Sequence, residues 1–156
     1  MNVGLVSEDI IIAAEPQKLF DIVADPSMHP VIDGSGSVRA ARPGNPSRLS
    51  DGATFSMDMK IGVTYKIRNA VVEFDEGRRI AWRHFNGHVW RYLFYPVEGG
   101  TKVTEQWDPA LAKNKLALRL MGFPARNRRG IHRTLERLAD IATQPKRRRP
   151  NQSGPS

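Results

Sequence analysis

The feature that most constrains this chain is a series of short β-prone runs separated by turn-rich segments. Six such runs follow the Gly34-Ser35-Gly36 turn, and they span residues 37–41, 54–61, 63–74, 79–85, 89–95 and 102–107. The segments between them are rich in Gly, Pro, Asn and Asp, with Asn86-Gly87 and Glu98-Gly99-Gly100 as examples. None of these segments suits a crossover helix, so neighbouring strands are predicted to be antiparallel.

Residues before this series add one strand and two helices. The run 6–13 predicts a further strand, which brings the sheet to seven. Glu15-Pro16 then begins a helix that ends at Asp25-Pro26, because proline is well tolerated in a first helical turn. Residues 27–33 predict a second short helix before the chain turns into the sheet.

The C-terminal part of the chain has a helical period. After Asp108-Pro109 the pattern becomes helical, with a break at Gly122-Phe123-Pro124. One stripe of this helix then runs to Ala142 and consists of Asn127, Ile131, Leu135 and Leu138. The sequence therefore predicts an α+β fold in which a long or kinked C-terminal helix packs on a seven-stranded antiparallel sheet.

The composition excludes several classes of site. A chain of 156 residues fits one domain, which buries roughly 70% of the surface that its unfolded form exposes. The absence of cysteine excludes disulfides, thiolate zinc sites and cysteine nucleophiles. Glu8 and Asp9 interrupt the only apolar stretch of residues 1–14, which argues against a signal peptide or a membrane span. We expect a soluble, cytoplasmic protein with no metal or cofactor.

Positive charge is concentrated at the C-terminus. The formal net charge is +8, and half of it comes from one run, Lys146, Arg147, Arg148 and Arg149. Residues 144–156 also lack an apolar anchor, so they are predicted to be a disordered basic tail behind a ligand-binding domain of residues 1–143. Such a tail either keeps the protein soluble or contacts RNA, the ribosome or an acidic membrane.

One strand and one hairpin indicate which face of the sheet is buried. Strand 54–61 alternates, and its apolar face carries Phe55, Met57, Met59 and Ile61. In the last hairpin the expected cross-strand pairs are Phe94 with Val103, Tyr92 with Glu105 and Trp90 with Trp107. Partners in such pairs point the same way, so the aromatic side chains are predicted to gather on one surface.

The register of the preceding hairpin has two readings. A two-residue loop at Asn86-Gly87 would place Arg83 beside Trp90. A three-residue loop that includes His88 would instead pair His84 with Trp90. The second is preferred, because the first would place the cation of Arg83 in an apolar layer.

A change of face is predicted within strand 63–74. Tyr65 and Ile67 share one parity, whereas Val72 and Phe74 share the other, which predicts a bulge near Ala70 that curves the sheet. A curved sheet lined by aromatic and methionine side chains and covered by an amphipathic helix can enclose a ligand pocket. From the pattern alone, a completely filled core is the commoner outcome.

Four short motifs occur once each along these elements. They are the helix start Glu15-Pro16, then Asp25-Pro26, Ile80-Ala81-Trp82 and Gly100-Thr101-Lys102-Val103-Thr104-Glu105. In this order they resemble the polyketide cyclase/dehydrase and lipid transport family, which belongs to the SRPBCC (START-like, Bet v 1-like) helix-grip superfamily. The resemblance covers residues 7–142 and implies a sheet wrapped around a long C-terminal helix, with a hydrophobic ligand cavity between them. It carries over no catalytic residue, because the fold hosts carriers, receptors and cyclases alike.

Polar residues on the predicted inner face are the candidates for chemistry. They are Asn69, His84 and Glu105 on the strands and Asn127 on the helix. If His84 and Glu105 approach one another, they can act as the acid/base pair of a cyclase or dehydratase; otherwise they orient a ligand through hydrogen bonds. His84 and His88 have a metal-ligand spacing only on a helix, and the turn between them argues against a metal site.

The sequence thus predicts a module that binds or transports a small apolar molecule such as a lipid, a quinone or a polyketide-like compound, as a monomer or dimer. One alternative is a polyketide cyclase/dehydratase that uses His84 and Glu105 as catalytic residues, and another is RNA or ribosome contact through the basic tail. The predicted ligand-binding residues are Phe55, Met57, Met59, Tyr65, Asn69, Trp82, Trp90, Tyr92, Trp107, Leu120, Asn127 and Ile131.

Overall fold

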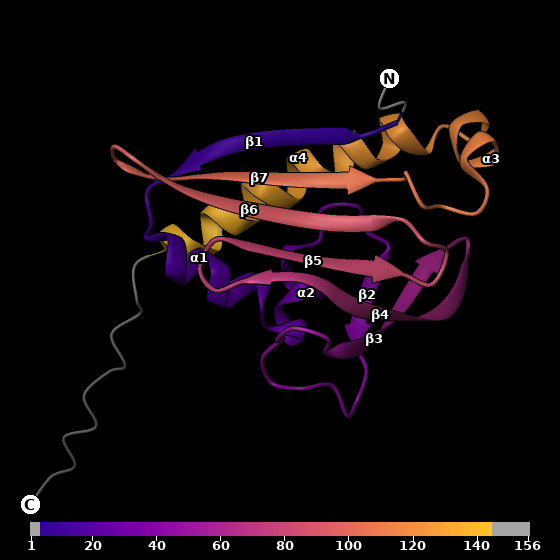
Figure 1. Cartoon of the computed structure of the whole chain (residues 1–156), viewed down its shortest axis with the longest axis horizontal. Helices are drawn as coiled ribbons and strands as arrows, with labels where there is room; N and C mark the ends of the chain where they lie inside the picture. The colour runs from indigo at the N-terminus through magenta and orange to yellow at the C-terminus, as the bar shows by residue number, and fades with distance from the viewer. Residues whose placement is uncertain (1–3, 145–156) are drawn as a thin grey trace, which may run out of the picture.

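One antiparallel sheet curves around a C-terminal helix in the computed structural model, which describes residues 4–144 (Figure 1). The strands are β1 (Val6–Ile12), β2 (Val38–Ala41), β3 (Thr54–Ile61), β4 (Val63–Asp75), β5 (Arg79–His84), β6 (Val89–Val97) and β7 (Gly100–Asp108). Their order in the sheet is β1-β7-β6-β5-β4-β3-β2, and every neighbouring pair is antiparallel. The predicted fold class is confirmed. The predicted basic run, Lys146 to Arg149, lies outside the described residues.

One group of helices follows β1, and a second group follows β7. Between β1 and β2 come α1 (Pro16–Val23), the 3-10 turn η1 (Pro26–Met28) and α2 (His29–Ile32). After β7 come α3 (Lys115–Leu120) and α4 (Phe123–Thr143). The helical pattern after β7 is therefore divided between two helices. Gly122 between them has a φ of 77°, which a residue with a side chain rarely adopts.

The two ends of the space between sheet and helix differ in how they are filled. At the α1 end, Leu135 and Leu138 of α4 are fully buried with Phe20 of α1. The ring of Phe20 meets that of Phe94 on β6 edge-on, with centroids 5.6 Å apart. Each fully buried side chain of this size stabilises the fold by roughly 1.5–3 kcal/mol. This end is a packed core, as the helical stripe predicted.

The hairpin between β5 and β6 has neither of the two predicted registers. Its loop is Phe85-Asn86-Gly87, so Trp82 pairs with Trp90 and the His84 N–H donates to the His88 carbonyl at 2.9 Å. Gly87, at a φ of 98°, supplies the left-handed residue that ends a three-residue loop. The shift from the preferred register is two residues, so His84 still faces inward.

The bulge predicted near Ala70 is confirmed, two residues further along β4. The register against β5 shifts between Val71 and Glu73. Val72 is the extra residue, and its side chain is exposed while that of Val71 is buried. Val71 keeps the inward parity of Ile67 and Asn69, and the extra residue then brings Phe74 to the inner face.

A tight contact joins the loop after α2 to α4. The Gly34 N–H donates to Thr134 Oγ1 at 2.9 Å. A Cβ atom on Gly34 would lie 2.3 Å from Arg133 Cβ and 2.5 Å from Thr134 N. On the helix side, a Cβ on Gly130 would lie 3.1 Å from Ser35 Cβ. The loop can approach α4 this closely only because residue 34 has no side chain.

Substitution of these two glycines tests that contact. We expect Gly34→Ala to lower the free energy of unfolding by about 1–3 kcal/mol or more, because the new methyl group overlaps helix backbone that cannot yield. Gly130→Ala should be nearly neutral, since the gain of about 1 kcal/mol in helix propensity offsets a small shift of Ser35. Urea denaturation measures both. An unchanged midpoint for Gly34→Ala would contradict the contact.

Candidate functional site

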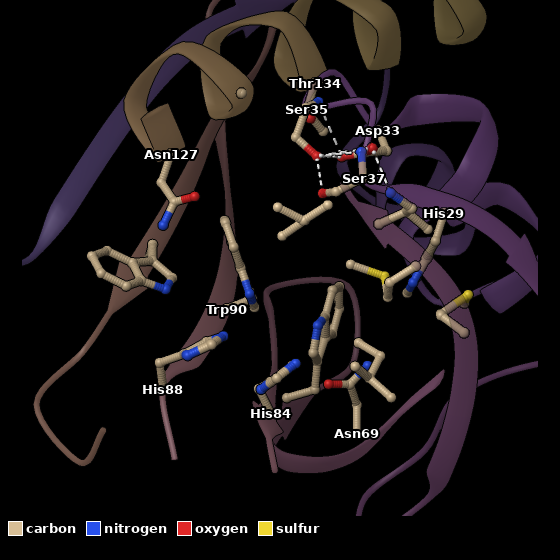
Figure 2. A pocket seen from close by; sticks show the side chains of 18 of the residues that line it. His29, Asp33, Ser35, Ser37, Asn69, His84, His88, Trp90, Asn127 and Thr134 are labelled. Atoms are coloured by element: carbon tan, nitrogen blue, oxygen red, sulfur yellow. Dashed lines mark hydrogen bonds between the residues drawn. The ribbon is translucent and has the colours of Figure 1, made fainter. Parts of the chain in front are cut away.

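A cavity of about 380 Å³ lies between the inner face of the sheet and the first half of α4 (Figure 2). The cavity exists because the side chains that α4 turns toward the sheet differ in size between the two ends of the helix. Leu135 and Leu138 fill the α1 end, whereas Asn127 and Gly130 face the cavity at the other end. A glycine and a short amide leave space that a leucine would occupy. The volume falls within the range of small-molecule sites.

The walls of the cavity are mainly apolar and aromatic. The larger side chains come from five neighbouring strands: Met57, Met59, Tyr65, Ile67, Trp82, Trp90 and Trp107. The chain has three tryptophans, and all of them line the cavity. Phe85 lines it as well but is 63% exposed, so the cavity opens to solvent beside the β5–β6 turn.

Most of the predicted ligand-binding residues line this cavity. They are Met57, Met59, Tyr65, Asn69, Trp82, Trp90, Tyr92, Trp107 and Asn127. Phe55, Ile131 and Leu120 do not. Phe55 lies behind the wall, where its ring meets those of His29 and Trp82 edge-on.

The other two corrections concern the helices. Ile131 is 1% exposed and belongs to the packed core rather than to the cavity wall. Leu120 is 78% exposed, and Leu118 lines the cavity in its place. The reason is the break at Gly122: α3 is a separate helix, so the phase of α4 does not extend to residue 120.

Sequence reasoning missed a polar cluster at one rim of the cavity. The Asp33 carboxylate accepts hydrogen bonds from the N–H and Oγ of Ser35 and from the Val38 N–H, at 3.2, 2.8 and 3.1 Å. The hydroxyls of Ser35 and Ser37 are 2.6 Å apart, and Figure 2 shows this cluster beside Thr134. The turn residues around Gly34 were its only sequence signal, and they are typical of any tight turn.

A row of three polar side chains lies at the opposite rim, near the β5–β6 turn. Asn69 on β4 is the cross-strand partner of His84 on β5, and His84 is followed across the turn by His88. The two imidazole rings stack, with centroids 4.4 Å apart and planes 12° apart. Asn86 N–H donates to His84 Nδ1 at 3.2 Å. In Figure 2 these side chains lie across the cavity from Asp33.

Both histidines of this row are neutral at physiological pH. Burial lowers the pKa of His84 to about 4. Burial, together with the nearby His84, lowers the pKa of His88 to about 3. Protonation of either ring would place an uncompensated cation in a largely apolar site.

Glu105 on β7 is the other buried titratable group of the cavity. It is 4% exposed and is the cross-strand partner of Tyr92 on β6. Burial raises the pKa of Glu105 to about 8, against the opposing effect of the Tyr92 hydrogen bond. Glu105 Oε2 is buried without a hydrogen-bond partner among residues 4–144. Near neutral pH this carboxyl group is therefore mainly protonated.

The structure does not bring His84 and Glu105 together as the acid/base hypothesis required. His84 is level with His88, and Glu105 is level with Tyr92, four residues further along β6. Four residues of strand span about 13 Å. The expected approach depended on the hairpin register, which is shifted by two residues. The two side chains therefore face different parts of the cavity.

Residues 4–144 contain neither a cluster of metal ligands nor a membrane-spanning helix. Within that part of the chain, three or more His, Asp or Glu side chains are nowhere grouped so that they could hold a metal ion. None of the helices described there has both the length and the apolar character needed to cross a membrane.

Comparison with solved structures shows the fold. Protein CV1439 from Chromobacterium violaceum superposes with a TM-score of 0.71 at 14% identity, over 91% of this chain and 99% of that protein. The AHSA1-like protein from Aeromonas hydrophila superposes with a TM-score of 0.63 at 19% identity, over 88% and 93% of the two chains. At these identities the similarity concerns the fold alone.

Sequence comparison shows the family. The uncharacterised protein Rv0088 of Mycobacterium tuberculosis is 39% identical over 146 residues, which is 88% of this chain and 63% of that relative. The chain thus spans less than two thirds of the length of this relative. The profile of the family described as polyketide cyclase/dehydrase and lipid transport matches residues 4–143. The chain therefore belongs to the polyketide cyclase/dehydrase and lipid transport family.

Proposed function

We propose that this protein binds a small, mainly apolar molecule, such as a lipid, a quinone or a polyketide-like compound, in the cavity between the sheet and α4. The observation that carries the proposal is the cavity of about 380 Å³, with its aromatic wall and its opening beside Phe85. Membership of a family that includes lipid transport supports it.

The energetics of the cavity favour an apolar occupant. A space of this volume corresponds to about a dozen water molecules at ~30 Å³ each. Waters against Met57, Met59 and Trp90 gain few hydrogen bonds, so their displacement by an apolar group is favourable. A ligand that buries ~200 Å² of apolar surface there gains roughly 5 kcal/mol before the costs of association are subtracted.

A bulky side chain in the cavity should block binding. We expect Met59→Trp to weaken the binding of N-phenylnaphthylamine, a neutral dye that fluoresces in apolar surroundings, by about tenfold or more. The added ring takes up space in the wall. Val63→Trp is the matched control, because Val63 is exposed on the neighbouring strand. Dye titration measures both. Equal affinities for the two variants, or no dye binding by the unmodified protein, would contradict the proposal.

The protonated carboxyl of Glu105 favours a second candidate function, a cyclase or dehydratase. Glu105 could give its proton to a departing hydroxyl, which leaves as water, and the resulting carboxylate could take a proton from the neighbouring carbon. His84 is too far along the sheet to act on the same bond. This mechanism therefore depends on Glu105 alone and differs from the pair inferred from the sequence.

Compounds extracted from the purified protein separate the two functions. For an enzyme, we expect Glu105→Gln to retain a compound heavier by one water than the one retained by the unmodified protein, because dehydration is lost. For a carrier, the same compound should be recovered from both. Mass spectrometry of the extracts distinguishes these outcomes.

The raised pKa of Glu105 also makes stability depend on pH. Its proton is held more tightly in the folded state, with a pKa of about 8, than in the unfolded state near 4.5. The contribution of Glu105 to the free energy of unfolding is therefore fully present below pH 4.5 and is lost as the pH rises through 8. Between about pH 7 and pH 9, where His84 and His88 stay neutral, the free energy of unfolding should fall by roughly 1 kcal/mol.

That fall should be absent in Glu105→Gln, because an amide does not titrate. Glu98→Gln, at an exposed position in the β6–β7 turn, should follow the unmodified protein. Urea denaturation at several pH values gives the three curves. If Glu105→Gln keeps the full pH dependence, the buried carboxyl is not its source.

A further inference from the structure

We infer that the ligand carries a neutral hydroxyl group, and that this group binds between Asn69 and His84 by donating a hydrogen bond to the first and accepting one from the second. The inference rests on the proposed function, because it specifies how the cavity would recognise an otherwise apolar molecule. It is carried by the hydrogen-bond chemistry of the polar row near the β5–β6 turn.

Asn69 offers an acceptor that the described protein does not use. Its side chain is 3% exposed, lines the cavity and has an Oδ1 atom without a hydrogen-bond partner among residues 4–144. An unsatisfied buried carbonyl of this kind destabilises the protein, because it has lost its hydrogen bonds to water. A ligand group that donates a hydrogen bond to Oδ1 would recover this free energy, whereas a purely apolar ligand would leave the oxygen unpaired.

His84 offers a donor beside that acceptor. Its Nδ1 accepts the Asn86 N–H at 3.2 Å, which requires a lone pair on that nitrogen. In a neutral imidazole the proton is then on Nε2, so this atom can only donate. His88 stacks on the His84 ring and restricts its orientation. His84 also lines the cavity, and its Nε2–H has no hydrogen-bond partner among residues 4–144, so it is available to a bound molecule.

One ligand atom can meet both groups. Asn69 and His84 are direct cross-strand partners on the inner face, and the Cβ atoms of such partners lie about 4.5–5.5 Å apart. An atom placed between them must donate to the amide oxygen and accept from the imidazole. A hydroxyl oxygen does both, an ether or ketone only accepts, and an ammonium only donates. A carboxylate would place its negative charge against Asn69 Oδ1.

Arg126 provides the alternative that the experiment must exclude. It also lines the cavity, from α4, and its guanidinium lies over the ring of Phe123, 5.8 Å from the centroid. Recognition through Arg126 would favour an anionic ligand, whereas recognition through Asn69 and His84 favours a neutral one. These two modes of recognition therefore predict opposite preferences between an anionic probe and a neutral probe that are otherwise identical.

The test uses the full chain and three probes with the same biphenyl body: para-phenylphenol, para-methylbiphenyl and para-phenylbenzoate. Equilibrium dialysis measures each affinity. We expect the phenol to bind about tenfold more tightly than the methyl compound, as two net hydrogen bonds would give, and the carboxylate to bind most weakly. Equal binding of the phenol and the methyl compound, or tightest binding of the carboxylate, would overturn the inference.

Variants locate the preference on the polar row. Asn69→Leu keeps the size of the side chain and removes the acceptor, so the tenfold preference should fall to less than twofold. His84→Phe keeps a stacking ring and removes the donor, so it should lower the preference in the same way. This variant tests the inference independently if Asn69→Leu does not fold. Asn127→Leu, on the opposite wall, should change both affinities alike and keep their ratio. A lost preference in Asn127→Leu would place the hydroxyl elsewhere and overturn the inference.

The outcomes also separate this inference from the proposed function. If none of the three probes binds, the cavity does not take apolar guests and the proposed function fails. If all three bind with equal affinity, the proposed function stands and only the hydroxyl site between Asn69 and His84 is wrong.

Discussion

The packing of α4 against the curved sheet is the interaction on which the rest of the structure depends. At one end, Leu135 and Leu138 are buried with Phe20 and hold the helix on the sheet. At the other end, Gly130 and Asn127 leave a cavity of about 380 Å³. Because the leucine end already holds the helix on the sheet, the other end can remain hollow.

Three titratable groups of the cavity, His84, His88 and Glu105, are held uncharged. Burial holds His84 and His88 neutral through lowered pKa values and holds the carboxyl of Glu105 protonated through a raised one. A neutral group loses much less solvation in an apolar site than an ion does. The interior can therefore combine an aromatic wall with hydrogen-bonding groups at separate places, which suits a molecule that is apolar along its body and polar at defined positions.

Much of the fold could be predicted, because it follows from patterns with short range. Alternation placed β3 at its observed bounds, and the Pro16 signal placed the start of α1. The predictions that were wrong depend on contacts between segments. The β5–β6 loop is Phe85-Asn86-Gly87 rather than the preferred Asn86-Gly87-His88, and the β4 bulge lies two residues beyond Ala70, at Val72. Neither position has a unique local signature.

The sequence by itself determined the antiparallel sheet, the inward faces of the strands and the aromatic content of the cavity, because side-chain alternation and turn chemistry act within a few residues. Only the tertiary structure decided that the core is hollow at one end, that Phe55, Leu120 and Ile131 lie away from the cavity, and that His84 lies beside Asn69 rather than Glu105. These features depend on the registers between strands and on the crossing of α4 over the sheet, which arise when distant segments pack together.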